Sequence, residues 1–129
     1  MAKSRPIAIV HLIDNDRAVR ESTQLFLQTA GIEVYAYSTA MEFLSDVHLR
    51  EIECVVIDVN LPGLSGVELL DRIGKENPIA GAIFTTARGD SAGLRAAAAR
   101  TGAAILLKPF KADHLLALVR NVFGGRGAR

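Results

Sequence analysis

Four polar side chains with complementary chemistry each follow a short apolar run of the sequence. They are Asp14, Asp58, Thr86 and Lys108. Two carboxylates about 4 Å apart repel by roughly 4 kcal/mol at an effective dielectric of about 20, which favours recruitment of a cation. Lys108 supplies one positive charge, and a divalent metal would supply the rest. A metal beside an aspartate, a lysine and a hydroxyl is the set of groups that phosphoryl transfer needs.

Asp58 is the most informative of these residues. It ends the apolar run Cys54–Ile57 and precedes Val59-Asn60-Leu61-Pro62-Gly63. This pattern is typical of a buried strand whose carboxyl end has just left the core. An acidic side chain in that position is paired, bound to a cation or engaged in chemistry, because burying it without a partner is costly.

Strand-like apolar runs alternate with longer stretches of helical period, which predicts a parallel sheet covered on both faces. Five strands are expected, at Ala8–Ile13, Glu33–Tyr37, Cys54–Ile57, Ala82–Thr85 and Ile105–Leu107. The first, third and fifth are almost entirely apolar and are expected inside the sheet, whereas the mixed second strand suits an edge. Ligands of such sheets bind beyond the carboxyl ends of the strands, where the four polar residues fall.

Five helices are expected to accompany these strands. They are Arg17–Ala30, a helix that follows Ser38, Gly66–Lys75, a helix that begins near Asp90 and includes Ala96–Ala99, and Ala112–Phe123. Asp16 is the expected N-cap of the first helix. The apolar residues of Ala112–Phe123 cover more than one stripe, for which core packing is the commoner reason and a partner surface the alternative. Because Gly124–Arg129 has no periodicity, we expect a domain over residues 1–123 and a flexible tail or the start of a linker over residues 124–129.

Length and composition limit the functions of this chain. At 129 residues, half of them hydrophobic, it is long enough for one domain with one core. The formal net charge of +1 provides no broad basic surface, so the chain alone is not expected to bind nucleic acid. Ile7–Ile13 is too short to span a membrane, and Asp14-Asn15-Asp16 is unlike a signal cleavage site. Cys54 is interpreted as a small buried hydrophobe and His11 as a core or sheet-face histidine, and a reducing, cytoplasmic location fits best.

Four segments resemble the signature segments of bacterial response-regulator receiver domains of two-component systems. They are Ile13-Asp14-Asn15-Asp16, Val56-Ile57-Asp58-Val59-Asn60-Leu61-Pro62-Gly63, Phe84-Thr85-Thr86-Ala87-Arg88-Gly89-Asp90 and Leu107-Lys108-Pro109-Phe110. They occur in order over Ile7–Phe123 and are most similar to receivers of the nitrogen-fixation regulator type. The resemblance implies a single doubly wound (βα)5 domain of the α/β class, flavodoxin-like, with a five-stranded parallel sheet of order 2-1-3-4-5.

The resemblance also implies a role for each polar residue. Asp58 would be the phosphoacceptor, taking a phosphoryl group from a sensor histidine kinase or a phosphotransfer protein. Asp14 and Asp58 would hold Mg²⁺ together with the backbone carbonyl of Asn60. Thr86 would close its hydroxyl onto the phosphoryl group, and Lys108 would pair with another of its oxygens.

A receiver of this kind would be a signalling domain that catalyses its own phosphorylation and dephosphorylation, and not an enzyme with a separate substrate. By resemblance, a cis bond between Lys108 and Pro109 would aim the lysine inward. The expected contact surface, including that of a homodimer, comprises the helix with Ala96–Ala99, the strand Ile105–Leu107 and the helix Ala112–Phe123.

Two positions depart from the family pattern. Asn15 replaces the second acid of the usual pair, so its oxygen would be a weak ligand and the affinity for Mg²⁺ should be lower. Capping the first helix is the expected role of Asp16, and replacement of the missing acid is the alternative. Ile105 replaces the usual Tyr or Phe that moves inward with Thr86, and this stiffer β-branched side chain is expected to alter coupling to the outer face.

Three classes of function fit these residues. A phosphorylation-dependent receiver is supported by Asp58, Thr86 and Lys108. A pseudo-receiver that acts as a phosphorylation-independent interaction module is supported by Asn15 and Ile105. A phosphatase of the haloacid dehalogenase type also uses a strand-end Asp, but it normally has a second Asp two residues later, where this chain has an Asn.

Overall fold

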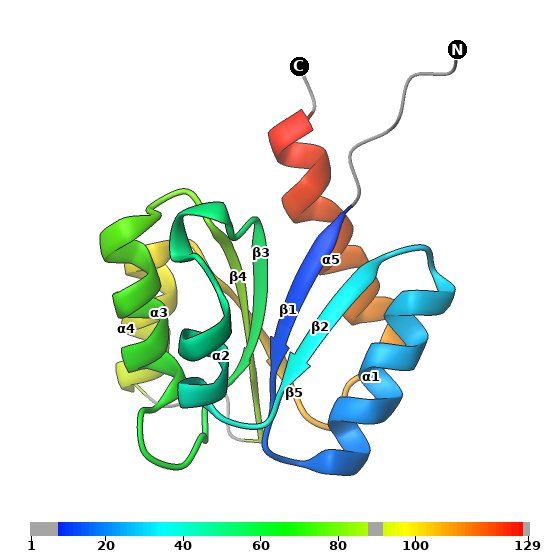
Figure 1. Cartoon of the computed structure of the whole chain (residues 1–129), viewed down its shortest axis with the longest axis horizontal. Coiled ribbons are helices and arrows are strands. Elements are labelled where there is room, and N and C mark those ends of the chain that lie inside the picture. Colours follow the sequence, from blue (N-terminus) through cyan, green and yellow to red (C-terminus); the bar gives the residue numbers. More distant parts are fainter. Residues whose placement is uncertain (1–7, 88–91, 128–129) are drawn as a thin grey trace.

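Five parallel strands form one sheet in the order β2-β1-β3-β4-β5. The computed structural model describes residues 8–87 and 92–127, and Figure 1 shows the strands running toward a common edge. The strands are β1 (Ile9–Ile13), β2 (Glu33–Tyr37), β3 (Cys54–Asp58), β4 (Gly81–Thr86) and β5 (Ala104–Leu107). The predicted α/β class and strand order are therefore confirmed.

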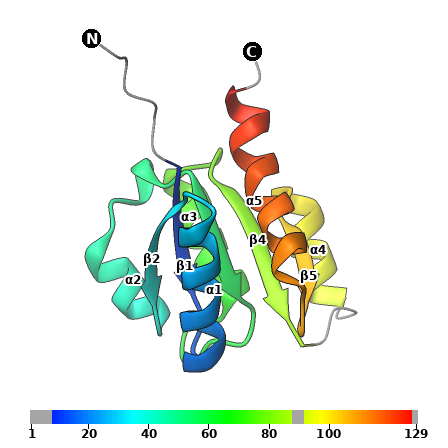
Figure 2. The same ribbon diagram turned by 90° about the vertical axis from the view of Figure 1, so that its right-hand side faces the viewer.

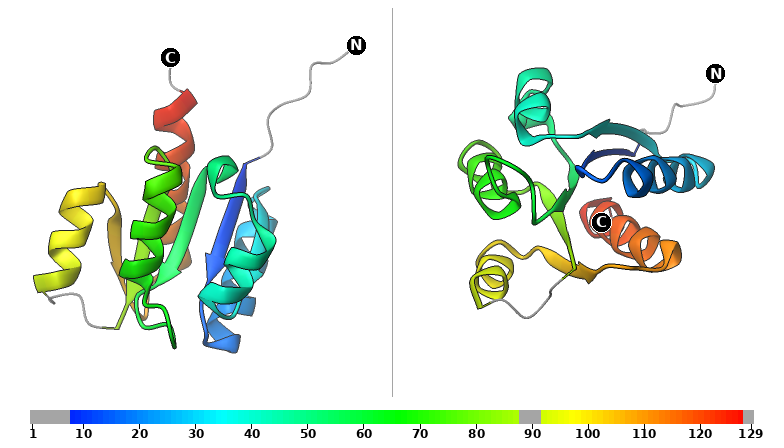
Figure 3. Two further views of the ribbon diagram at one scale, coloured as in Figure 1. Left: turned by 60° about the vertical axis from the view of Figure 1, so that its left-hand side comes forward. Right: turned by 90° about the horizontal axis from the view of Figure 1, so that it is seen from below.

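Helices cover both faces of this sheet. They are α1 (Arg17–Thr29), α2 (Ala40–Asp46), α3 (Gly66–Glu76), α4 (Ala92–Thr101) and α5 (Ala112–Gly127), with a short 3-10 helix at Leu49–Glu51. Figure 3 shows α2, α3 and α4 on one face and α1 and α5 on the other. In Figure 2, α1 and α5 both lie in front of the sheet, where they contact each other. This is the doubly wound arrangement that the alternation of runs predicts.

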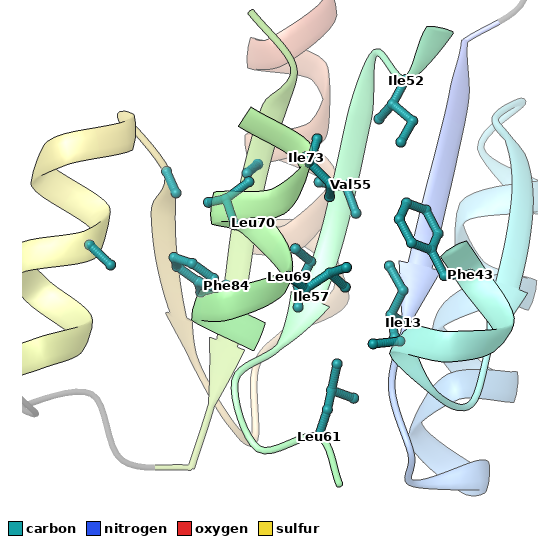
Figure 4. Close-up of a cluster of buried hydrophobic side chains, with 14 of the residues drawn as sticks. Ile13, Phe43, Ile52, Val55, Ile57, Leu61, Leu69, Leu70, Ile73 and Phe84 are labelled. Atoms are coloured by element: carbon teal, nitrogen blue, oxygen red, sulfur yellow. The ribbon is translucent and has the colours of Figure 1, made fainter. Parts of the chain in front are cut away.

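Two apolar clusters, one on each face of the sheet, hold these layers together. The cluster beneath α2, α3 and α4 includes the fully buried Phe43, Ile57, Leu69 and Phe84 (Figure 4). The cluster beneath α1 and α5 includes Val10, Leu27, Leu115 and Val119. Further apolar residues of α5 pack against this second cluster. Core packing therefore accounts for the second apolar stripe of that helix.

The positions of three strands test the expectations drawn from their sequences. All residues of β3 are buried, as expected for an interior strand, and β2 lies at an edge. The expectation that the strand Ile105–Leu107 lies inside the sheet was wrong, because β5 forms the opposite edge. The apolar residues of β5 are covered by the helices on both faces of the sheet instead. Ile105 packs against the cluster beneath α2, α3 and α4, and Leu106 packs against the cluster beneath α1 and α5.

Two helix ends also bear on the predictions. The last helix continues to Gly127, so its expected end at Phe123 was wrong and residues 124–127 are helical. Extending an existing helix needs no new nucleation, which lets these low-propensity glycines join its last turn. The expected start of the fourth helix near Asp90 lies outside the described residues, and α4 is described from Ala92.

Candidate functional site

The carboxyl ends of four strands bring the predicted site residues to one edge of the sheet. Asp14 follows β1, Asp58 ends β3, Thr86 ends β4 and Lys108 follows β5. The register pairs Asp58 with Thr85, so neighbouring strands end level with each other. The site lies where open α/β sheets bind their ligands.

Lys108 connects the two aspartates of the site. Its Nζ lies 3.0 Å from Asp14 Oδ2 and 3.2 Å from Asp58 Oδ2. The side chains of Asp14 and Asp58 are only 3% and 7% exposed, and that of Lys108 is 18% exposed. One ammonium group thus faces two buried carboxylates, which leaves a formal charge of minus one for a further cation to neutralise.

The backbone holds the other oxygen of each aspartate. The Asp16 N–H donates to Asp14 Oδ1 at 2.8 Å, and the Asn60 N–H donates to Asp58 Oδ1 at 2.9 Å. Each carboxylate is therefore fixed by a loop that follows its own strand, with its Oδ2 atom directed at Lys108. Preorganised groups of this kind need little rearrangement when a ligand binds.

Arg20 also contacts the site, and sequence reasoning missed it. Its Nη1 donates to the backbone carbonyl of Asp14 at 2.7 Å, which ties the first turns of α1 to the end of β1. The only signal in the sequence is its place one helical turn after Asp16. A contact with a backbone carbonyl requires no particular residue type at position 14, so it leaves no motif.

Burial and charge shift the pKa values of two site residues in the same direction. Burial raises the pKa of Asp14, although hydrogen bonds from the Asp16 N–H and from Lys108 oppose the shift. Burial alone lowers the pKa of Lys108, but its hydrogen bond to Asp14 and the charges of Asp14 and Asp58 outweigh that effect, so its pKa is raised. Lys108 is consequently a permanent positive charge at neutral pH.

The residues beside Lys108 link the site to strand β5. Thr86 is 1% exposed, and its carbonyl accepts a hydrogen bond from the Lys108 N–H at 2.7 Å. The bond between Lys108 and Pro109 is cis, as expected. Ile105 is partly buried against the cluster beneath α4. A displacement of Thr86 would therefore reach both the lysine and β5 through the backbone.

The donor set fits Mg²⁺. The carboxylates of Asp14 and Asp58 are buried and meet at Lys108 Nζ, and Mg²⁺ commonly takes one or two carboxylates while it keeps several waters. In the described part of the chain, no three His, Cys, Asp or Glu side chains gather as a metal site, in agreement with Asn15 replacing an acid. Asn15 is exposed. Asp16 is engaged as the N-cap of α1, where its carboxylate accepts from the Val19 N–H at 3.1 Å, as predicted.

Gly66, the first residue of α3, lets this helix approach the end of β3. Its N–H donates to the carbonyl of Val59 at 3.1 Å. A Cβ atom at Gly66 would lie 2.6 Å from the carbonyl oxygen of Asp58 and 2.9 Å from Ile57 Cγ2. Because the first of these atoms belongs to the backbone, it cannot move without displacing Asp58.

The substitution Gly66→Ala should lower the free energy of unfolding by about 1–3 kcal/mol through overpacking. Gly74 provides a matched control in the same helix, because nothing lies within 4 Å of a Cβ built there. Gly74→Ala should raise the free energy of unfolding by about 0.5–1 kcal/mol through helix propensity. Urea unfolding followed by circular dichroism measures both values, and equal effects of the two substitutions would contradict the close approach.

Two other residues singled out in the sequence have the structural roles expected for them. Cys54 is fully buried within β3. His11 is partly buried on the face of the sheet, where its ring stacks with those of Tyr35 and Tyr37. Neither side chain contributes to the cluster around Lys108.

The strand order is the one that the resemblance to receiver domains of two-component signalling proteins implies, and two aspartates and a lysine meet at the edge of the sheet. The family model for the response regulator receiver domain matches residues 10–120, and the chain belongs to this family. The phosphatase alternative is therefore wrong.

Individual relatives agree with this assignment. The chain is 38% identical over 116 residues to the transcriptional regulatory protein FixJ of Azorhizobium caulinodans, covering 89% of this chain and 54% of that protein. It is 31% identical over 117 residues to the response regulator protein TodT of Pseudomonas putida, covering 88% and 50%. The CheY-like receiver domain protein from Methanospirillum hungatei has a TM-score of 0.85 at 25% identity, with 96% of this chain and 100% of that chain covered.

The curated relatives are longer than this chain. The chain spans about half the length of the curated relatives it matches. The expected likeness to receivers of the nitrogen-fixation regulator type is confirmed. Within the described residues, no helix combines the length and the apolar character needed to cross a membrane.

Proposed function

We propose that Asp58 accepts a phosphoryl group from a sensor histidine kinase or a phosphotransfer protein. The observation that carries this proposal is the buried pair of Asp58 and Asp14, whose Oδ2 atoms lie 3.2 and 3.0 Å from Lys108 Nζ. The proposed nucleophile Asp58, the proposed metal ligand Asp14 and the positive charge of Lys108 thus belong to one cluster of contacts. Buried acidic groups that converge on one ammonium group at a ligand-binding edge of the sheet are candidates for a functional site.

Each site residue has a separate task in the transfer. A carboxylate oxygen of Asp58 attacks the phosphorus of a phosphohistidine, and the new oxygen–phosphorus bond forms as the phosphorus–nitrogen bond breaks. The electron pair of the broken bond returns to the donor imidazole. Lys108 stabilises the charge on the phosphoryl oxygens, and Thr86 donates its hydroxyl to one of them. Attack by water on the phosphorus later breaks its bond to the Asp58 oxygen, which releases inorganic phosphate and restores the carboxylate.

Mg²⁺ is the proposed cofactor. The carboxylates of Asp14 and Asp58 and the backbone carbonyl of Asn60 would hold it, with Asn15 as a weak additional ligand. When bound, the ion neutralises negative charge on the phosphoryl oxygens. Lys108 neutralises part of the same charge from its position between the two aspartates.

Beryllofluoride, a mimic of the phosphoryl group, tests the proposal without a kinase. With Mg²⁺ present, it should form an adduct that shifts the amide NMR resonances of Asp58, Thr86 and Lys108. Asp58→Asn should form no adduct. The pseudo-receiver remains the second candidate because Asn15 lowers the charge of the metal site, and absence of an adduct in the wild-type protein at high Mg²⁺ would favour it.

Restoring the missing acid should strengthen Mg²⁺ binding. In Asn15→Asp, one more carboxylate faces the ion, and we expect the dissociation constant to fall by roughly tenfold. Gln28→Glu makes the same chemical change on an exposed position of α1 and should leave the constant unchanged. Isothermal titration calorimetry measures both, and equal affinities in Asn15→Asp and the wild type would show that position 15 does not face the ion.

Ile105 is proposed to alter how the structural effect of phosphorylation is transmitted to the surface formed by α4, β5 and α5. Its β-branched side chain is packed against the cluster beneath α4 and has no ring to move inward. In Ile105→Tyr, beryllofluoride should therefore change the resonances of α4 and β5 more widely than in the wild-type protein. Equally wide changes in both proteins would rule out this role for Ile105.

The proposed output surface consists of α4, β5 and α5, where a homodimer could form. It includes Leu107, a large apolar side chain that is 53% exposed at the edge of the sheet. We propose a cytoplasmic setting, where sensor kinases present their phosphohistidine. The formal net charge of +1 gives no support to nucleic-acid binding by this chain alone.

A further inference from the structure

The turn that joins β1 to α1 carries two residues of the proposed metal site. Asp14 follows the end of β1, Asn15 comes next, and α1 begins at Arg17 (Figure 1). The Asp16 N–H donates to Asp14 Oδ1 at 2.8 Å, which closes the turn around Asn15. The direction of the Asp14 carboxylate and the position of Asn15 therefore both depend on the conformation of these three residues.

Arg20 contacts both ends of this turn from one helical turn away. Its Nη1 donates to the carbonyl of Asp14 at 2.7 Å, and its backbone N–H donates to the carbonyl of Asp16 at 2.8 Å. The second bond belongs to the first turn of α1 and does not depend on the type of side chain at position 20. The first bond is made by the side chain, so a substitution can remove it and leave the helix intact.

Each polar group of Asp14 has a partner. Its N–H donates to the carbonyl of Tyr37 at 3.0 Å, its Oδ1 accepts from the Asp16 N–H, and its Oδ2 lies 3.0 Å from Lys108 Nζ. The Arg20 side chain supplies the fourth contact, to the carbonyl. Asp14 is buried and Arg20 is half-buried, so this charge-assisted hydrogen bond is partly shielded from water, which strengthens it.

We propose that Arg20 is a positioning residue for Mg²⁺, which holds the turn of residues 14–16 in the conformation that lets Asp14 and Asn15 bind the ion. Hydrogen bonds to the groups that carry metal ligands orient those ligands, and their loss commonly costs about 10–100-fold in metal affinity. This role rests on the proposed function, because Asp14 and Asn15 are ligands only if the site binds Mg²⁺.

Charge and positioning predict opposite effects of removing the Arg20 side chain. By charge alone, loss of a guanidinium group beside the site would strengthen the binding of a divalent cation. If the side chain positions the turn, its loss leaves the carbonyl of Asp14 without this donor and weakens binding instead. A merely structural role would lower the stability of the protein and leave the affinity of the folded molecules unchanged. The sign of the change in affinity therefore separates these roles.

Isothermal titration calorimetry with Mg²⁺ measures this sign. Arg20→Ala should raise the dissociation constant by about tenfold. Arg17→Ala is the matched control, because it removes the same charge from the same helix. Arg17 pairs with Glu21 at 2.9 Å, and these side chains are 81% and 61% exposed, so its loss should not raise the constant. Arg20→Lys keeps the charge and a donor, and its constant should lie closer to that of the wild type than to that of Arg20→Ala.

Circular dichroism at the temperature of the titration checks that each variant is folded. Unchanged or tighter Mg²⁺ binding in Arg20→Ala, an equal rise in Arg17→Ala, or no recovery in Arg20→Lys would overturn the role of Arg20 and leave the assignment of Asp58 untouched. Absence of Mg²⁺ binding in the wild-type protein would overturn the proposed metal site itself and, with it, this role.

Discussion

Asp58→Asn should abolish phosphoryl incorporation from acetyl phosphate and Mg²⁺, whereas the wild-type protein gains the mass of one phosphoryl group. An amide has no anionic oxygen with which to form the acyl phosphate. The shape of the side chain is nearly unchanged, so the fold should persist. Intact-protein mass spectrometry measures the incorporation, and circular dichroism checks the fold.

Asp71→Asn is the matched control for this substitution. Asp71 is partly exposed and pairs with Arg100 at 2.7 Å on the surface, a contact that contributes little to stability. The Asp71→Asn protein should be phosphorylated at the wild-type rate. Continued incorporation in Asp58→Asn at that rate would mean that another residue is the acceptor.

Lys108→Ala should slow phosphorylation by about 100-fold, which corresponds to about 2.7 kcal/mol of activation free energy. The reason is that Lys108 Nζ is the charged group that contacts both carboxylates, at 3.0 and 3.2 Å. Without it, charge on the phosphoryl oxygens is neutralised by Mg²⁺ alone. The rate of incorporation from acetyl phosphate at saturating Mg²⁺ gives the measurement.

Lys111, three residues further along, separates this local effect from a general loss of positive charge. It is exposed, so Lys111→Ala should retain the wild-type rate to within about a factor of two, as expected for a surface substitution. If Lys111→Ala were as slow as Lys108→Ala, net charge and not the contact with the aspartates would explain the effect.

The site was predictable from the sequence to the extent that strand ends determine position. The apolar run before Asp58 fixes where β3 ends, and parallel strands bring their carboxyl ends to one edge. The same rule predicts that Asp14, Thr86 and Lys108 lie at this edge of the sheet. What the pattern could not supply was the detail that one lysine contacts both aspartates.

Other features were hidden for identifiable physical reasons. The apolar run of β5 has the same composition whether a neighbouring strand or two flanking helices bury it, so its edge position was not predictable. Gly124 and Gly125 signal the end of a helix by propensity, but α5 was already nucleated and continues to Gly127. Arg20 acts through the backbone carbonyl of Asp14, a contact that leaves no motif in the sequence.

Chemical trapping of the phosphorylated residue tests the central claim most directly. After incubation with acetyl phosphate and Mg²⁺, borohydride reduces an acyl phosphate to the alcohol, so a phosphorylated aspartate is recovered as homoserine. Peptide mass spectrometry should find homoserine at position 58 and aspartate at position 14. Homoserine at position 14 or elsewhere, or none at any position in a folded, Mg²⁺-loaded protein, would contradict the assignment of Asp58 as the phosphoacceptor.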